Sequence, residues 1–228
     1  MKTLGRRTLV LALMGLLPAF GFAQQDILGN WIMYFGQNRI AEKWSVHTEM
    51  QYRSHDVGTD TDQWLFRIGL NYLIQPTVWL TGGYAYISNH PYGSDQTGAL
   101  TTEDRIWQQL LVKNALGRVD LEHRYRFEQR WIENNFTTRF RYRFLGTLPL
   151  NKNRMGPGAL FLCVYDEIFI KNHRPYYDRN RFYTALGYQF KPTANIQAGF
   201  LNQTVASYDK WYFQVALFYN TDLRRKEE

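Results

Sequence analysis

The sequence predicts an all-β fold, an antiparallel transmembrane β-barrel of about 10–12 strands, and three observations support this prediction. Polar and apolar side chains alternate along several segments of about nine to thirteen residues. Aromatic residues make up 17% of the chain and gather at the ends of the apolar faces. The N-terminus has the features of an export signal. Strands of soluble proteins are usually nearer five or six residues, so these segments suit tilted strands that cross a membrane.

The first residues indicate where the protein is delivered. Three basic residues, Lys2, Arg6 and Arg7, precede an uncharged apolar run that ends in small residues. This pattern is typical of a secretory signal peptide, so we expect residues 1–23 to be removed and residues 24–228 to form the outer-membrane barrel. The alternative, a membrane anchor helix, is disfavoured because the run is short and polar residues follow it.

Charge and cysteine content narrow the classes of function. Loss of the signal peptide removes three positive charges, which lowers the formal net charge from +7 to +4. The sequence pI of about 9.4 does not indicate nucleic-acid binding, because an exported protein rarely meets nucleic acid. The lone Cys163 excludes an intramolecular disulfide framework. After the signal, no apolar stretch is long enough for a transmembrane helix.

Alternation with a period of two defines the strands. Five segments alternate cleanly, at residues 44–52, 64–72, 119–131, 136–144 and 211–219. Six weaker strands are expected at residues 27–37, 77–88, 105–114, 159–170, 181–190 and 196–204. The total is eleven, whereas single-chain bacterial barrels normally have an even number of strands. Either one strand is wrongly assigned, or the first segment lies within or against the barrel.

The connections between these strands differ in length. Short turns are expected at residues 38–43, 74–76, 115–118 and 191–194, with a longer connection at 148–158. Longer polar loops are expected at residues 56–62, 89–104 and 171–180. Barrels place short turns in the periplasm, so the long loops are expected at the cell surface and residues 223–228 in the periplasm. The same rule starts the first strand outside, although a cleaved N-terminus begins in the periplasm.

Several short motifs resemble a known family. They are Trp31 with the stretch Lys43-Trp44-Ser45-Val46, and residues 124–130, 139–143, 165–169 and 179–183. In this order they are similar to the domain-of-unknown-function 2490 family, bacterial proteins that are predicted outer-membrane barrels without an assigned activity. The resemblance covers nearly all of the mature chain. It implies the fold and the outer-membrane location, and it carries no catalytic residues.

The polar faces of the strands are expected to point into the barrel. Thirteen charged residues are the candidate lumen lining: Arg53, Arg67, Arg105, Glu122, Arg124, Arg126, Glu128, Arg130, Arg139, Arg141, Arg143, Glu167 and Arg181. Glu49 and Asp120 are expected to face them, and of the adjacent Asp166 and Glu167 we assign Glu167 inward.

Two interpretations of this lumen remain open. The charged side chains could satisfy one another and fill a narrow lumen, a task that suits the planar fork of arginine. Alternatively, unpaired arginines could line a passage or pocket that attracts anions.

We therefore predict a structural role, or a narrow pore or transport role, and not an enzyme. The expected partners are outer-membrane lipid, lipopolysaccharide and the barrel assembly machinery during insertion, with no nucleic acid. No metal-ligand spacing and no glycine-rich phosphate loop is present, so no metal or cofactor is expected.

The alternatives are a lipid-modifying enzyme built on the barrel, a surface-loop binding protein, and a soluble periplasmic ligand-binding protein. An enzyme needs a nucleophile with a base in hydrogen-bond reach. His123 is expected on the lipid face, and His90 and His173 in loops. The enzyme interpretation therefore requires a Ser or His cluster at the outer rim, and replacement of His90 and His173 would have to abolish activity.

Overall fold

Eleven long strands and no helix make up the part of the chain that the computed structural model describes, residues 28–58, 60–92 and 100–224. The strands are β1 (Gly29–Arg39), β2 (Trp44–Ser54), β3 (Thr61–Gln75), β4 (Val78–Asn89), β5 (Thr101–Leu116), β6 (Val119–Ile132), β7 (Asn135–Pro149), β8 (Ala159–Lys171), β9 (Tyr177–Lys191), β10 (Ala194–Val205) and β11 (Asp209–Tyr219), followed by the two-residue β12 (Thr221–Asp222). Within these ranges, no helix has the length and apolarity that crossing a membrane would require. The expected signal peptide lies outside the described residues.

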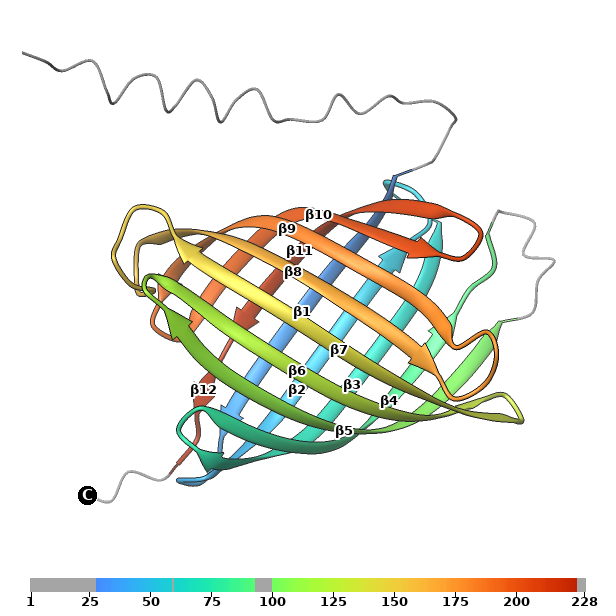
Figure 1. Ribbon diagram of the computed structural model, residues 1–228, viewed down its shortest axis with the longest axis horizontal. Helices are drawn as coiled ribbons and strands as arrows, with labels where there is room; N and C mark the ends of the chain where they lie inside the picture. Colours follow the sequence, from blue (N-terminus) through green and yellow to red (C-terminus); the bar gives the residue numbers. More distant parts are fainter. Residues whose placement is uncertain (1–27, 59, 93–99, 225–228) are drawn as a thin grey trace, which may run out of the picture.

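The strands close into a barrel (Figure 1). Each strand from β1 to β11 pairs with the next in antiparallel orientation, and β1 also pairs with β11. This last pairing is parallel and joins seven residue pairs, from Gly29 with Tyr212 to Phe35 with Phe218. The expected all-β, largely antiparallel barrel is therefore confirmed.

The odd number of strands is a property of the barrel. With eleven strands the first and the last run in the same direction, so they can close the ring only by a parallel pairing. Both explanations that we considered for the odd count are wrong, because β1 is a full member of the wall and pairs with β2 along ten residues. As a consequence, β1 begins at one end of the barrel and β11 finishes at the other (Figure 1).

The two ends differ in their connections. We call the end where β1 finishes the turn end; its connections are residues 40–43, 76–77, 117–118, 150–158 and 192–193. The loop end carries the connections from β2 to β3, β4 to β5, β6 to β7, β8 to β9 and β10 to β11. All three longer loops are shorter than expected, because β3 starts at Thr61, β5 at Thr101 and β9 at Tyr177.

Alternate residues face into and out of the barrel, as the pleat of a strand requires. On β6, Tyr125 and Phe127 are each 40% exposed, whereas Arg126 is 3% exposed and Glu128 is fully buried. The other cleanly alternating segments follow the same rule. Six large aromatic residues are nevertheless buried inside the barrel: Trp31, Trp107, Phe161, Phe169, Tyr183 and Tyr212.

Candidate functional site: the charged lumen

The barrel encloses a cavity of about 1330 Å³. Its lining runs from Lys43 and Asp222 at the turn end to Asp62 and Asn89 at the loop end. Fifteen Lys or Arg side chains and eight Asp or Glu side chains contribute to this lining. The cavity lining is therefore rich in charged side chains and carries an excess of positive charge.

The structure brings the thirteen candidate lumen residues together. Twelve of them line the cavity, and the thirteenth, Glu128, is fully buried against the arginines that do. Glu49 and Asp120 also line it. Of the adjacent acidic pair, Glu167 points inward, while the Asp166 carboxylate accepts hydrogen bonds from Asn180 on the exposed side.

Glu128 on β6 is the centre of an ion-pair network along β5 to β9. Arg139 and Arg141, both on β7, donate to its two carboxylate oxygens at 2.7 and 2.8 Å, and Arg105 on β5 lies 3.2 Å away. Charge-assisted hydrogen bonds of this kind are about twice as strong as neutral ones. Three guanidinium groups therefore compensate for the burial of one carboxylate.

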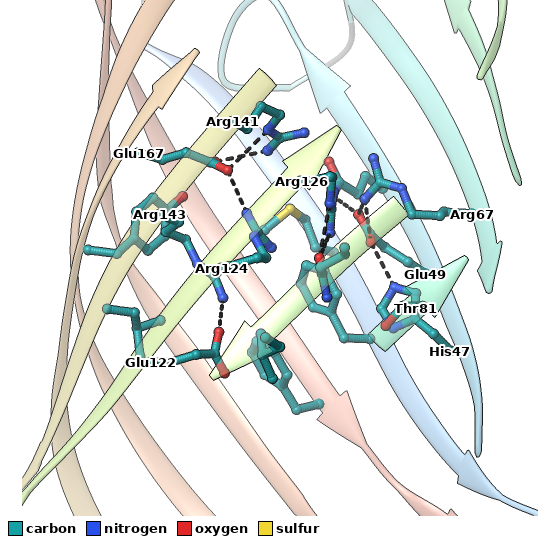
Figure 2. Close-up of a pocket in the computed structure, with 18 of the residues that line it drawn as sticks. His47, Glu49, Arg67, Thr81, Glu122, Arg124, Arg126, Arg141, Arg143 and Glu167 are labelled. Carbon is teal, nitrogen blue, oxygen red and sulfur yellow. Dashed lines mark hydrogen bonds and ion pairs between the residues drawn. The ribbon is translucent and has the colours of Figure 1, made fainter. Parts of the chain in front are cut away.

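The network continues on both sides of Glu128. Arg141 and Arg124 both donate to Glu167, at 2.9 and 2.7 Å (Figure 2). On β5, Glu103 pairs with Arg105 at 2.6 Å and with Arg130 at 2.7 Å. This side of the lumen thus matches the interpretation in which charged side chains satisfy one another.

A second, smaller group occupies β2 and β3. Both oxygens of Glu49 accept from Arg67 at 2.6 Å, and one of them lies 3.0 Å from His47 (Figure 2). The Trp107 ring lies beside this group, with Arg67 5.5 Å and Arg126 4.8 Å from its centroid. Arginine over a tryptophan face is a favourable cation–π arrangement.

Three buried arginines have no carboxylate within ion-pair distance among the described residues. Each is bound to a glutamine amide oxygen instead: Arg53 to Gln51, Arg126 to Gln109 and Arg181 to Gln203, with shortest distances of 2.6, 2.6 and 2.8 Å. An amide oxygen satisfies a donor but leaves the charge uncompensated. Within the described residues, the lumen therefore combines arginines paired with carboxylates and three arginines that bind only amide oxygens.

Sequence reasoning missed several charged residues of the lumen. Glu103 and Arg179 were placed in loops, yet each lies two residues before an expected lumen arginine, Arg105 or Arg181. Lys210 likewise lies two residues before the inward-facing Tyr212. Continuing the alternation by one step at the start of each strand would have found all three.

The comparison with known protein families can now be reported. A family model described as "Protein of unknown function (DUF2490)" matches residues 28–214, which is nearly the whole described barrel. The chain belongs to this family. The resemblance drawn from the sequence motifs is thereby confirmed.

A relative with similar sequence is an uncharacterised protein of Methylorubrum extorquens. It is 28% identical over 164 residues, which cover 68% of this chain and 69% of the relative. No solved structure matches. Among the described residues there is also no group of three or more His, Cys, Asp or Glu side chains that could hold a metal ion.

The ion-pair network leads to a prediction about stability. Replacing Glu128 with Gln leaves three buried arginines without their shared carboxylate, so we expect the free energy of unfolding to fall by about 3–5 kcal/mol. Glu122→Gln is the matched control, because Glu122 is partly exposed and pairs closely with Arg143 only. Urea titration of the two variants measures the difference, and equal losses would contradict the central role of Glu128.

Proposed function

We propose that this protein is a non-catalytic β-barrel of the bacterial outer membrane whose lumen forms a narrow passage that prefers anions. The observation that carries the proposal is the combination of an apolar outer face with a basic cavity lined from one end of the barrel to the other. The first feature suits a lipid environment, and the second suits a charged solute.

The apolar outer face supports the membrane location. Every one of the eleven long strands carries at least one large apolar or aromatic side chain that is more than a third exposed: Ile32, Met50, Phe66, Leu80, Ile106, Phe127, Phe140, Leu160, Phe182, Phe200 and Leu217. In water, an apolar surface that surrounds the whole molecule would be strongly unfavourable and would cause aggregation. Against lipid acyl chains the same surface is expected.

Aromatic pairs at two levels along the barrel axis also support the membrane location. Trp44 and Tyr72 lie side by side towards the turn end, and Tyr52 and Trp64 towards the loop end, each pair with ring centroids 4.7 Å apart. Eight residues of tilted strand separate the two levels, which corresponds to about 20 Å along the barrel axis. Amphipathic rings at this spacing suit the two boundaries of the hydrocarbon layer.

The charge of the lining supports the anion preference. Even with the carboxylates of Glu128 and Asp178 added, the fifteen basic side chains face only ten acidic ones. Charged rings select ions of opposite sign in pores. The excess positive charge therefore favours anions inside the barrel.

The expected route of export and membrane insertion fits this proposal. The signal peptide would direct export, the barrel assembly machinery would insert the chain, and lipid and lipopolysaccharide would contact its outer face. The long loops would then face the cell surface, and the C-terminus would lie in the periplasm.

The location is tested by fractionation of cells that express the full chain. We expect the protein in the outer-membrane fraction, released only by detergent, and we expect unboiled samples to migrate differently from boiled ones on a denaturing gel. Recovery in the soluble periplasmic fraction without detergent would contradict the proposal.

The passage is tested by single-channel recording in a planar bilayer under a KCl gradient. We expect small conductance steps with a reversal potential that indicates chloride preference. Arg126→Gln should reduce this preference by up to about fivefold, because one unit charge at 4 Å is worth ~1 kcal/mol even in water. Lys152→Gln, outside the cavity, should leave it unchanged. Silence or cation preference would rule the passage out.

One observation favours a second candidate, a lipid-modifying enzyme. At the loop end, Nε2 of His90 lies 3.1 Å from the hydroxyl oxygen of Ser88, a distance at which a base can activate a nucleophile. His173 lies outside this pair, with its Nδ1 3.1 Å from the backbone carbonyl oxygen of Arg174. His173 therefore serves as a control.

The enzyme candidate is tested with phospholipid and lipopolysaccharide substrates in mixed micelles. If the pair is catalytic, Ser88→Ala and His90→Ala each lower hydrolysis at least a hundredfold, in line with the loss of general-base catalysis, while His173→Ala has no effect. Our non-catalytic proposal expects no hydrolysis above the buffer rate in any of the proteins.

A further inference from the structure

Two of the carboxylate-free arginines meet at one tryptophan. The guanidinium carbon of Arg53 lies 4.0 Å from the centroid of the Trp31 ring, and that of Arg181 lies 4.8 Å from the same point. Arg53 is the cross-strand neighbour of Trp31, whereas Arg181 is on β9, on the other side of β10 and β11. The fold thus brings two like charges together that are far apart in the sequence.

Several hydrogen-bond donors of Arg53, Arg181 and Trp31 have no acceptor among the described residues. Nε and Nη2 of Arg53 bind Gln51, and Nε of Arg181 binds Gln203, which leaves the remaining terminal N–H groups without a hydrogen-bond partner in the described part of the chain. The indole Nε1 of Trp31 is buried and also has no hydrogen-bond partner there. A buried donor without an acceptor is costly, and a buried pair of like charges is more so.

In the described part of the chain, no carboxylate lies within ion-pair distance of Arg53 or Arg181. Arg179 and Lys210 add positive charge to the same stretch of the cavity lining. Asp178 is already engaged by Arg139 at 3.0 Å and by Arg179 at 3.2 Å. Asp62 lines the cavity but lies outside ion-pair distance of both Arg53 and Arg181.

A second tryptophan in the lumen provides an internal comparison. Trp107 also lies beneath two arginines and also has a buried Nε1 without a partner. There, however, Glu49 already binds Arg67 at 2.6 Å. At Trp31, in contrast, neither arginine is paired with a carboxylate of the described residues.

We propose that Arg53, Arg181 and the indole N–H of Trp31 form a binding site for a small oxyanion, a carboxylate or phosphate group of a solute that enters the lumen from the loop end. Oxyanions fit because their several oxygens can accept from two guanidinium forks and one further donor at once. The arginines are 9% and 7% exposed and Trp31 is 3% exposed, so the bound group is largely removed from bulk water. The site goes beyond the proposed passage, because it predicts saturable binding at a defined position.

Isothermal titration of the folded full-length mature protein in a non-ionic detergent, with inorganic phosphate and with acetate as probes, tests this site. We expect saturable binding of at least one probe. Arg53→Gln and Arg181→Gln should each weaken it at least tenfold, the loss expected for one charge-assisted hydrogen bond. The better-bound probe identifies the chemical class of the group.

Two further variants make the result decisive. Lys113→Gln removes the same charge from the lining near the turn end, so binding should stay within twofold of the unsubstituted protein if the site is local. Trp31→Phe keeps an aromatic face for both arginines but removes the N–H, and should weaken binding severalfold even if an arginine variant fails to fold.

Absence of saturable binding of both probes, or an equal loss in Lys113→Gln, would overturn the site. Because titration in detergent requires no conduction, a silent bilayer with intact binding would reject only the passage. Conduction without binding would reject only the site.

Discussion

Closure of one sheet into a ring constrains everything else in this molecule. A β-sheet avoids unpaired backbone N–H and C=O groups at its two edges only if its first and last strands pair with each other. Here eleven strands meet that requirement through the parallel pairing of β1 with β11. Inside the barrel the same junction is covered by ring contacts between Trp31 and Tyr212 and between Phe35 and Phe218. Of the eleven strand pairings that form the wall, the pairing of β1 with β11 joins the fewest residues, and aromatic packing reinforces it.

Closure also decides the environment of each side chain. The period of two sends alternate residues inward, where the volume is limited and charges lie close together. Because arginines outnumber carboxylates there, the carboxylates become shared: Glu128 serves three guanidinium groups and Glu167 serves two. Arg53, Arg126 and Arg181, which have no carboxylate within ion-pair distance among the described residues, rest on tryptophan faces and bind glutamine oxygens. The paired network and the unpaired set are thus two consequences of one imbalance.

The sequence predicted the parts that depend on neighbours along the chain. Alternation around Tyr125 and Arg126 assigned the inner and outer faces correctly, and the same logic selected Glu128 as an inward residue. The alternation could not place Trp31 or Trp107 inside the barrel. The sequence alone does not distinguish an aromatic residue that packs in the lumen from one that lies at a membrane boundary.

Contacts between distant strands were also out of reach of the sequence. Arg181 and Trp31 are neighbours only because the ring closes between β11 and β1. No local pattern indicates that a first and a last strand will pair in parallel. The composition of the lumen could therefore be predicted, whereas the grouping of its charges and the site at Trp31 required the structure.

The central claim is that the aromatic and aliphatic face contacts lipid while the arginine face is enclosed. Site-directed spin labelling tests this claim most directly. Single cysteines are introduced into the Cys163→Ser variant, and the labelled protein is reconstituted into liposomes. Labels replacing Phe127 and Phe140 should collide with dissolved oxygen and be shielded from a water-soluble nickel chelate, and a label replacing the lumen-lining Gln109 should show low oxygen collision. Ready access of the chelate to positions 127 and 140 would contradict the account.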